Sequence, residues 1–134
     1  MIADYLSGFP AFIAHFVLSC GFLVAYIAIY TYVTRHDEFA LLRQGNLAAA
    51  IALAGSTLGF SFPLASSVEY SASILDNALW AGVSLVVQIA VYLLIKMTIS
   101  DLNGRIERGE LAAAIWLGAV SIAAGQLAAA SMTT

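Results

Sequence analysis

The side chains with the most chemical potential are a few polar residues that interrupt long apolar stretches. Gln88 lies in the middle of one stretch, and Tyr92 follows one helical turn later on the same face. An amide in hydrocarbon must find a hydrogen-bond partner, so we expect Gln88 to face the interior of a helical bundle. His15, which can titrate near neutral pH, and Gln126 lie in two other stretches. With Glu69, these residues are candidates for a polar pocket or a pore mouth; the alternative is hydrogen bonding between helices.

A second candidate site surrounds Pro63. Proline has no amide hydrogen, so it frees the carbonyl of Gly59 one turn earlier in a helix. Ser61 lies nearby, and a free carbonyl beside hydroxyl groups could bind water or a cation. The alternative is that neighbouring side chains satisfy the carbonyl in an ordinary proline kink.

Groups that support catalysis or cofactor binding are missing from the sequence. It has no Gly-rich phosphate loop and no Ser/His/Asp arrangement, and His15 and His36 are expected near opposite membrane faces, too far apart to share a metal. Cys20 has no activating base in the sequence, so we expect a small buried hydrophobe. The carboxylates fall at the ends of the apolar stretches or between them, which argues against a proton-coupled pump. We therefore expect no enzymatic activity, no metal and no cofactor.

Composition decides the class of protein. Of the 134 residues, 62% are hydrophobic and only 10% are charged, against about 25% charged in a typical soluble domain. So few charges cannot cover the surface of a water-soluble globule, and the hydrophobicity excludes disorder. The net charge of −3 and the lack of a basic run disfavour a nucleic-acid partner. An integral membrane protein remains, with the lipid bilayer as its partner.

Four stretches are long enough to span a membrane, which takes about 20 mostly apolar residues in a helix. We expect an all-α integral membrane protein with four transmembrane helices in a single domain, residues 1–134. The spans are about Phe12–Thr34, Leu47–Val68, Ala78–Ile99 and Leu111–Met132.

The basic residues predict the orientation of the chain. All five flank the first and third connections between the spans: Arg35, Arg43, Lys96, Arg105 and Arg108. By the positive-inside rule these connections lie in the cytoplasm, and both termini lie outside it.

The sequence contains an internal repeat. A shift of 64 residues aligns 45–51 with 109–115, and it also aligns Thr34 with Thr98 and Asp37 with Asp101. Each unit, about 12–68 and 76–132, holds two helices, so we expect two tandem hairpins related as a parallel repeat.

The repeat extends to the connections. Asp37 and Asp101 are predicted to cap a short helix, which Gly45 and Gly109 then end in the left-handed conformation. Asn46 is placed to cap the helix that follows.

Small residues predict where helices approach closely. Gly55 and Gly59 are four residues apart on the second span, and Gly118 and Gly125 are one heptad apart on the fourth. These glycines pack helices within one copy or form a seam between copies of a homo-oligomer.

At these residues the chain resembles a known family. The segments 43–51 and 59–67, and the pair Val87-Gln88, are similar to those of the YjfL-type bacterial inner-membrane proteins, labelled as a domain of unknown function. That family's Asn-Ala-Ala-Cys-Met ending is replaced here by residues 127–132, Leu-Ala-Ala-Ala-Ser-Met, so any role of its Asn or Cys is not inherited. The resemblance implies a four-helix protein of the bacterial inner membrane with no established reaction. Because such genes in some bacteria neighbour one for a phage-shock-protein-A-like protein, it also implies a peripheral membrane-remodelling partner on the cytoplasmic side.

Two functions fit these expectations. The first is a non-enzymatic, oligomeric membrane scaffold or membrane-stress partner. The alternative is a small ion or solute channel or transporter.

Overall fold

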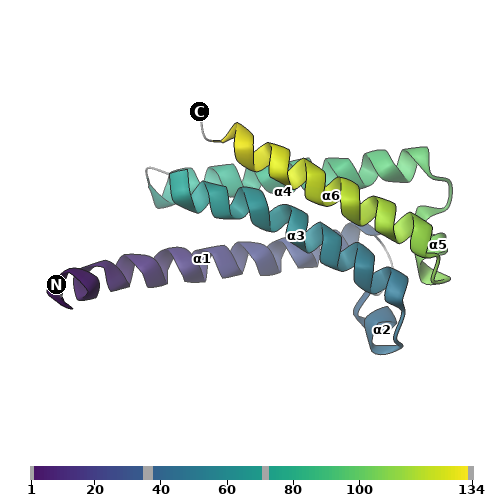
Figure 1. Cartoon of the computed structure of the whole chain (residues 1–134), viewed down its shortest axis with the longest axis horizontal. Helices are drawn as coiled ribbons and strands as arrows, with labels where there is room; N and C mark the ends of the chain where they lie inside the picture. Colours follow the sequence, from purple (N-terminus) through teal and green to yellow (C-terminus); the bar gives the residue numbers. More distant parts are fainter. Residues whose placement is uncertain (1, 35–37, 71–72, 133–134) are drawn as a thin grey trace.

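The computed structural model describes residues 2–34, 38–70 and 73–132, which form four long and two short helices (Figure 1). The long helices are α1 (Ile2–Thr34), α3 (Leu47–Tyr70), α4 (Ile74–Thr98) and α6 (Leu111–Ser131), and the short ones are α2 (Glu38–Arg43) and α5 (Leu102–Glu107). All four long helices have the length and hydropathy to cross a membrane. The all-α class and the four spans are therefore confirmed.

The first helix is longer than predicted. It begins at Ile2 instead of Phe12, and Pro10 lies inside it. The apolar pattern continues on both sides of the proline, and losing one backbone hydrogen bond bends a helix more readily than it ends one.

The short helices lie together at one end of the molecule, which we call the α2–α5 end (Figure 1). The start of α1, the end of α3, the start of α4 and the end of α6 lie at the opposite end (Figure 1). Helix α1 packs on the others through its last turns, because its buried residues are Tyr26, Tyr30 and Thr34, and its N-terminal part diverges from the bundle.

The backbones of α3 and α6 touch where they cross. A Cβ atom added to Gly55 would lie 2.3 Å from the Cα of Gly118, and one added to Gly125 would lie 1.9 Å from the carbonyl oxygen of Gly59. Only glycine leaves room for such an approach, which is how helices pack closely in lipid. The four glycines singled out in the sequence therefore pack α3 against α6 within one copy of the protein.

The same crossing covers the carbonyl that Pro63 frees. This proline is buried in α3 and cannot donate to Gly59. The Gly59 oxygen instead lies against the backbone of Gly125, close enough for a weak Cα–H···O contact. The nearby Ser61 hydroxyl donates to the carbonyl of Leu58 at 2.6 Å. The backbone of α6 thus occupies the place where the sequence suggested water or a cation.

The left-handed glycines of the two connections are confirmed, with φ of 79° at Gly45 and 82° at Gly109. The capping prediction for Asp101 is wrong. This residue has φ of 55° and makes no side-chain cap bond, because its carboxylate pairs with Arg108 at 3.1 Å. The same prediction for Asp37 lies outside the described residues.

Asn46 ties the two connections together. Its Oδ1 accepts a hydrogen bond from the amide of Ala49 at 3.0 Å, which caps α3 as predicted. Its Nδ2 donates to the carbonyls of Ile106 and Glu107, at 3.2 and 3.0 Å, at the end of α5. One side chain therefore holds the start of α3 against the end of α5.

Helix boundaries follow the 64-residue offset. Residues 38–43 of α2 shift onto residues 102–107 of α5, and the first residues of α3 and α6 are Leu47 and Leu111. Helices α1 and α4 end at Thr34 and Thr98. These matches support the duplication, which stays a prediction.

We predict that Gly125→Ala destabilises the bundle by about 1–3 kcal/mol, because the added methyl group overlaps the Gly59 carbonyl. Thermal unfolding in detergent, followed by circular dichroism, measures the effect. Gly82→Ala on α4 is the matched control, since a Cβ there meets nothing within 4 Å. Equal melting temperatures for the two variants would contradict the crossing.

Candidate functional site

Helix α4 carries its polar side chains on the buried face. Its lipid-facing positions include Leu79, Val86 and Leu94, all well exposed. Its buried residues are Asn77, Ala81, Ser84, Gln88, Tyr92 and Ile95. This distribution is the reverse of a soluble amphipathic helix, and it places a line of hydrogen-bonding groups along the interior of the bundle.

Gln88 occupies the middle of this line and faces the bundle interior, as the sequence suggested. The side chain is 1% exposed, and its Nε2 donates to the carbonyl of Ser121 on α6 at 3.2 Å. Its Oε1 lies beside Gly59 but accepts no hydrogen bond within the described residues. Gln88 therefore bonds to α6 with one end and keeps an unsatisfied acceptor with the other.

Aromatic side chains surround the line one turn closer to the α2–α5 end. Tyr26 stacks on Phe60 with ring centroids 4.4 Å apart, and Tyr30 meets the edge of Tyr92 at 5.5 Å. All four rings are buried. Ser56 lies beside the Tyr26 hydroxyl, although neither oxygen makes a hydrogen bond of standard geometry among the described residues. Three hydroxyl-bearing rings and a serine thus form a polar cluster inside the bundle.

Hydrogen bonds connect this cluster to the short helices. The Tyr92 hydroxyl donates to Oδ1 of Asn103 on α5, and Asn103 Nδ2 donates to the carbonyl of Thr34 at 2.6 Å. The Thr34 hydroxyl in turn donates to Oε1 of Glu38 at 2.7 Å. The chain of contacts begins on α4 and ends at a carboxyl on α2.

Glu38 is a buried carboxyl that the sequence analysis missed as a candidate. Its side chain is 1% exposed, and burial raises its pKa from 4.5 to about 7, against the opposing hydrogen bond from Thr34. Glu38 lies between two spans, as the sequence analysis states, but its carboxyl is enclosed and does not face solvent. The 64-residue offset could have revealed it, because Glu38 aligns with Leu102, an apolar and equally buried position.

Several predicted site residues lie outside this polar core. Gln126 and Glu69 are exposed on α6 and α3, so they do not join Gln88. His15 lies with Ser19 in an apolar groove of about 420 Å³ between α1 and α3, and its Nδ1 has no partner among the described residues. Cys20 is exposed, so the expectation of a small buried hydrophobe is wrong.

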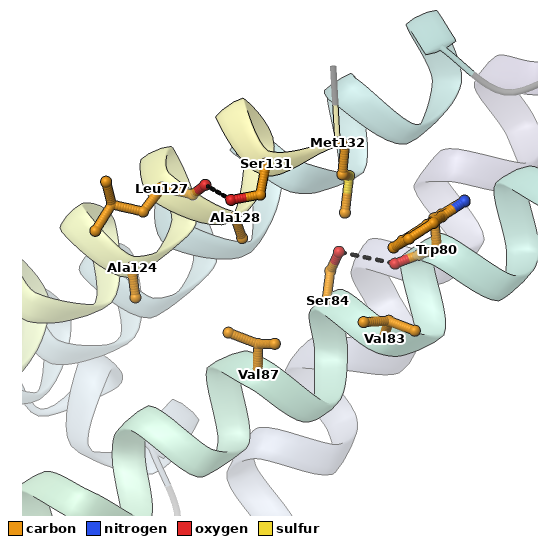
Figure 2. A pocket seen from close by; sticks show the side chains of 9 residues that line it. All are labelled: Trp80, Val83, Ser84, Val87, Ala124, Leu127, Ala128, Ser131 and Met132. Carbon is orange, nitrogen blue, oxygen red and sulfur yellow. Dashed lines mark hydrogen bonds between the residues drawn. The ribbon is translucent and has the colours of Figure 1, made fainter. Parts of the chain in front are cut away.

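A second groove, of about 400 Å³, lies between α4 and α6 near the C-terminus (Figure 2). Val83, Val87 and Leu127 contribute much of its apolar lining. The hydroxyls of Ser84 and Ser131 donate to carbonyls of their own helices. The groove thus has the character of the bilayer interior and suits a hydrocarbon chain.

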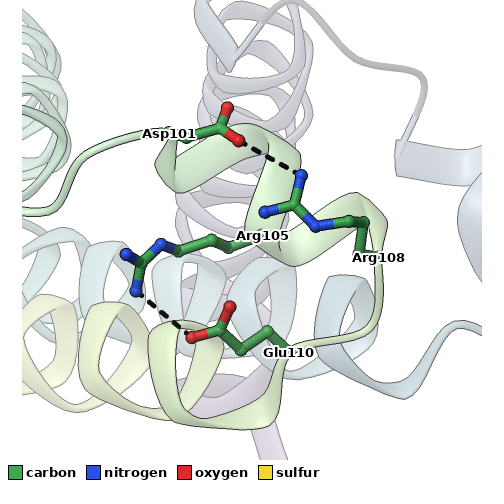
Figure 3. A network of polar contacts seen from close by, with 4 residues as sticks. All are labelled: Asp101, Arg105, Arg108 and Glu110. Atoms are coloured by element: carbon green, nitrogen blue, oxygen red, sulfur yellow. Dashed lines mark hydrogen bonds and ion pairs between the residues drawn. The ribbon is translucent and has the colours of Figure 1, made fainter.

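The charges on α5 and at the start of α6 neutralise one another (Figure 3). Arg105 pairs with Glu110 at 3.3 Å, and Arg108 pairs with Asp101 at 3.1 Å. Exposed pairs of this kind contribute little stability. Their effect is to leave a mixed, compact polar surface at the α2–α5 end. Within the part of the chain that the structure describes, no group of three or more His, Cys, Asp or Glu side chains could hold a metal ion.

Comparisons with known proteins identify a family and similar membrane proteins. The family model described as a domain of unknown function, DUF350, matches residues 4–132. The UPF0719 inner membrane protein YjfL of Escherichia coli K12 is 32% identical over 128 residues, which cover 96% of this chain and 97% of the relative. The protein of the same name from E. coli O157:H7 matches equally well. No solved structure matches the chain.

We predict that the stability of the protein falls as the pH rises from about 4.5 to about 7, because of Glu38. In this window the folded chain keeps the carboxyl protonated while the unfolded chain releases the proton, so the folded state binds more protons. Glu38→Gln should therefore raise the melting temperature at pH 8 and have little effect at pH 5. Melting in detergent at both pH values measures this, with Glu69→Gln, at an exposed site, as control. A variant that loses most stability at pH 8 would show that the ionised carboxylate stabilises the fold.

Proposed function

Since the chain belongs to the DUF350 family, whose relatives are named as inner membrane proteins, we propose that it conducts protons across that membrane through its polar core. The observation that carries the proposal is the burial of Glu38 at the end of a line of polar side chains that follows α4. A carboxyl enclosed in a membrane protein is costly and commonly marks a proton or ion pathway.

At the α2–α5 end, hydroxyl groups and Glu38 form the proposed route. Hydroxyls can both donate and accept a hydrogen bond, which proton transfer requires. Tyr26 and Tyr30 from α1 and Tyr92 from α4 lie close enough to Glu38 to feel the charge of its carboxylate. Asn103 positions the Tyr92 hydroxyl. With the basic connections in the cytoplasm, as the positive-inside rule predicts, Glu38 exchanges protons with the cytoplasmic side.

Towards the opposite end the route continues through amides and serines. Ser67 donates to Oδ1 of Asn77 at 2.7 Å, and Asn77 is fully buried, with an Nδ2 that finds no partner in residues 2–34, 38–70 and 73–132. Gln88 Oε1 and Ser56 Oγ add unsatisfied atoms at mid-depth. Buried polar atoms of this kind ordinarily bind water. Water held there would link the amides to the hydroxyls, since amides alone transfer protons poorly.

The test is proton flux in liposomes. Purified protein is reconstituted with an internal pH-sensitive dye, and a potassium diffusion potential drives proton entry. We expect flux above that of protein-free liposomes. Glu38→Gln removes the titrating group, and Gln88→Leu removes the mid-depth amide, so both should lower the flux to the protein-free level.

The matched control is Glu69→Gln, which removes an exposed carboxylate outside the route and should leave the flux unchanged. Circular dichroism and gel filtration verify that each variant is folded. Wild-type flux equal to that of empty liposomes would overturn the proposal, and so would full flux in the folded Glu38→Gln variant.

A scaffold is the second candidate function. It is favoured by the apolar surface that α1 and α6 leave uncovered, which offers room for other helices. The paired charges at the α2–α5 end leave little net charge for a peripheral membrane-remodelling partner. A scaffold function would therefore depend mainly on contacts with other helices inside the bilayer. Purification from crosslinked membranes tests it, and a preparation without associated proteins or higher oligomers would contradict it.

A further inference from the structure

Helix α6 has a second face that is left exposed by the described part of the chain. We call it the outer seam and define it by five exposed residues: Ala112, Trp116, Ala119, Ala123 and Gln126. They alternate four and three residues apart, which is the spacing of a helix that packs along a left-handed pair. The other face of α6, with Gly118 and Gly125, is already used against α3. The outer seam is therefore a distinct surface with the pattern of an interface.

The predicted internal repeat relates this face to one that is packed elsewhere in the chain. The 64-residue offset relates Ala119 and Ala123 to Gly55 and Gly59 on α3, and these glycines form the crossing with α6. It also relates Ala112 to Ala48, which is fully buried. The face that is covered on α3 thus has an exposed equivalent on α6, built again from small residues.

Gln126 adds to the outer seam an amide group that a second amide could satisfy by hydrogen bonding. It lies on the outer seam in an otherwise apolar part of α6, and its amide makes no hydrogen bond within the described residues. An amide exposed to hydrocarbon is unfavourable, whereas two amides facing each other satisfy both donors and acceptors. A lipid chain cannot do this, but a second Gln126 can.

Symmetry brings the two amides together. All copies insert with the same orientation, so a twofold axis along the membrane normal makes the two α6 helices parallel and places each residue near its equivalent. A single amide in a small-residue seam also fixes the register of a helix pair. We propose that α6 of one copy packs on α6 of a second copy through the outer seam, with the Gln126 amides hydrogen-bonded across the axis.

Disulfide crosslinking tests the proximity of the two seams. In a background with Cys20→Ala, because Cys20 is exposed, Ala123→Cys is introduced and the purified protein is oxidised in liposomes at low protein density. We expect a crosslinked dimer. Val86→Cys, an exposed position on α4 away from the seam, is the matched control and should remain monomeric.

The amide is tested separately. Gln126→Leu should weaken dimerisation, measured by energy transfer between labelled copies in liposomes, by about three- to thirtyfold. Gln126→Asn keeps an amide and should retain more of the affinity. Because Gln126 is exposed, neither change is expected to prevent folding, which circular dichroism verifies.

The proposal is overturned if Ala123→Cys and Val86→Cys crosslink equally or not at all, or if Gln126→Leu dimerises as strongly as the wild type. In the first case lipid or another protein covers the seam. The proposal is independent of proton conduction, since the polar core lies on the other side of α6. Flux without dimers, or dimers without flux, therefore contradicts one proposal and leaves the other standing.

Discussion

Helices inside a bilayer gain nothing from hiding apolar surface from one another, so the contact between α3 and α6 must be held by packing and weak polar interactions. The glycines supply both. Their missing side chains let the backbones touch, and the contact of the Gly59 oxygen with Gly125 compensates for the hydrogen bond that Pro63 removes. The proline and the glycines are therefore parts of one arrangement, in which a defect in one helix is covered by the backbone of another.

The polar core is built on this crossing. Gln88 reaches the Ser121 carbonyl because α6 lies so close to α3 at that level. From there the interior changes character along the bundle, from amides to tyrosines and finally to the Glu38 carboxyl. Asn46 closes the same end by tying α3 to α5. The glycine contact thus sets the position of groups that come from every long helix.

Much of the fold follows from the sequence because its signals are local. Hydropathy locates the spans, and single residues such as Gly45 and Gly109 determine where the short helices end. The sequence also indicates that Gln88 lies inside, since an amide in hydrocarbon has few alternatives. The hydrogen-bond partner of each polar group does not follow from local signals, because it depends on how the helices pack. Whether Glu38 faces water or tyrosines depends on how α2 folds back on the bundle, and hydropathy carries no information about that choice.

The length of α1 sets a condition on how the protein sits in its bilayer. Its 33 residues extend about 50 Å, whereas the hydrocarbon layer is about 30 Å thick. To keep the whole helix inside, it would have to lean by roughly 50°, beyond the usual limit of about 40°. At any usual lean the turns before Pro10 therefore extend beyond the hydrocarbon layer, and Tyr5 and Phe9 in these turns are residue types that suit the headgroup region. A thicker hydrocarbon layer would enclose more of these turns, so the length of α1 that contacts lipid chains depends on bilayer thickness.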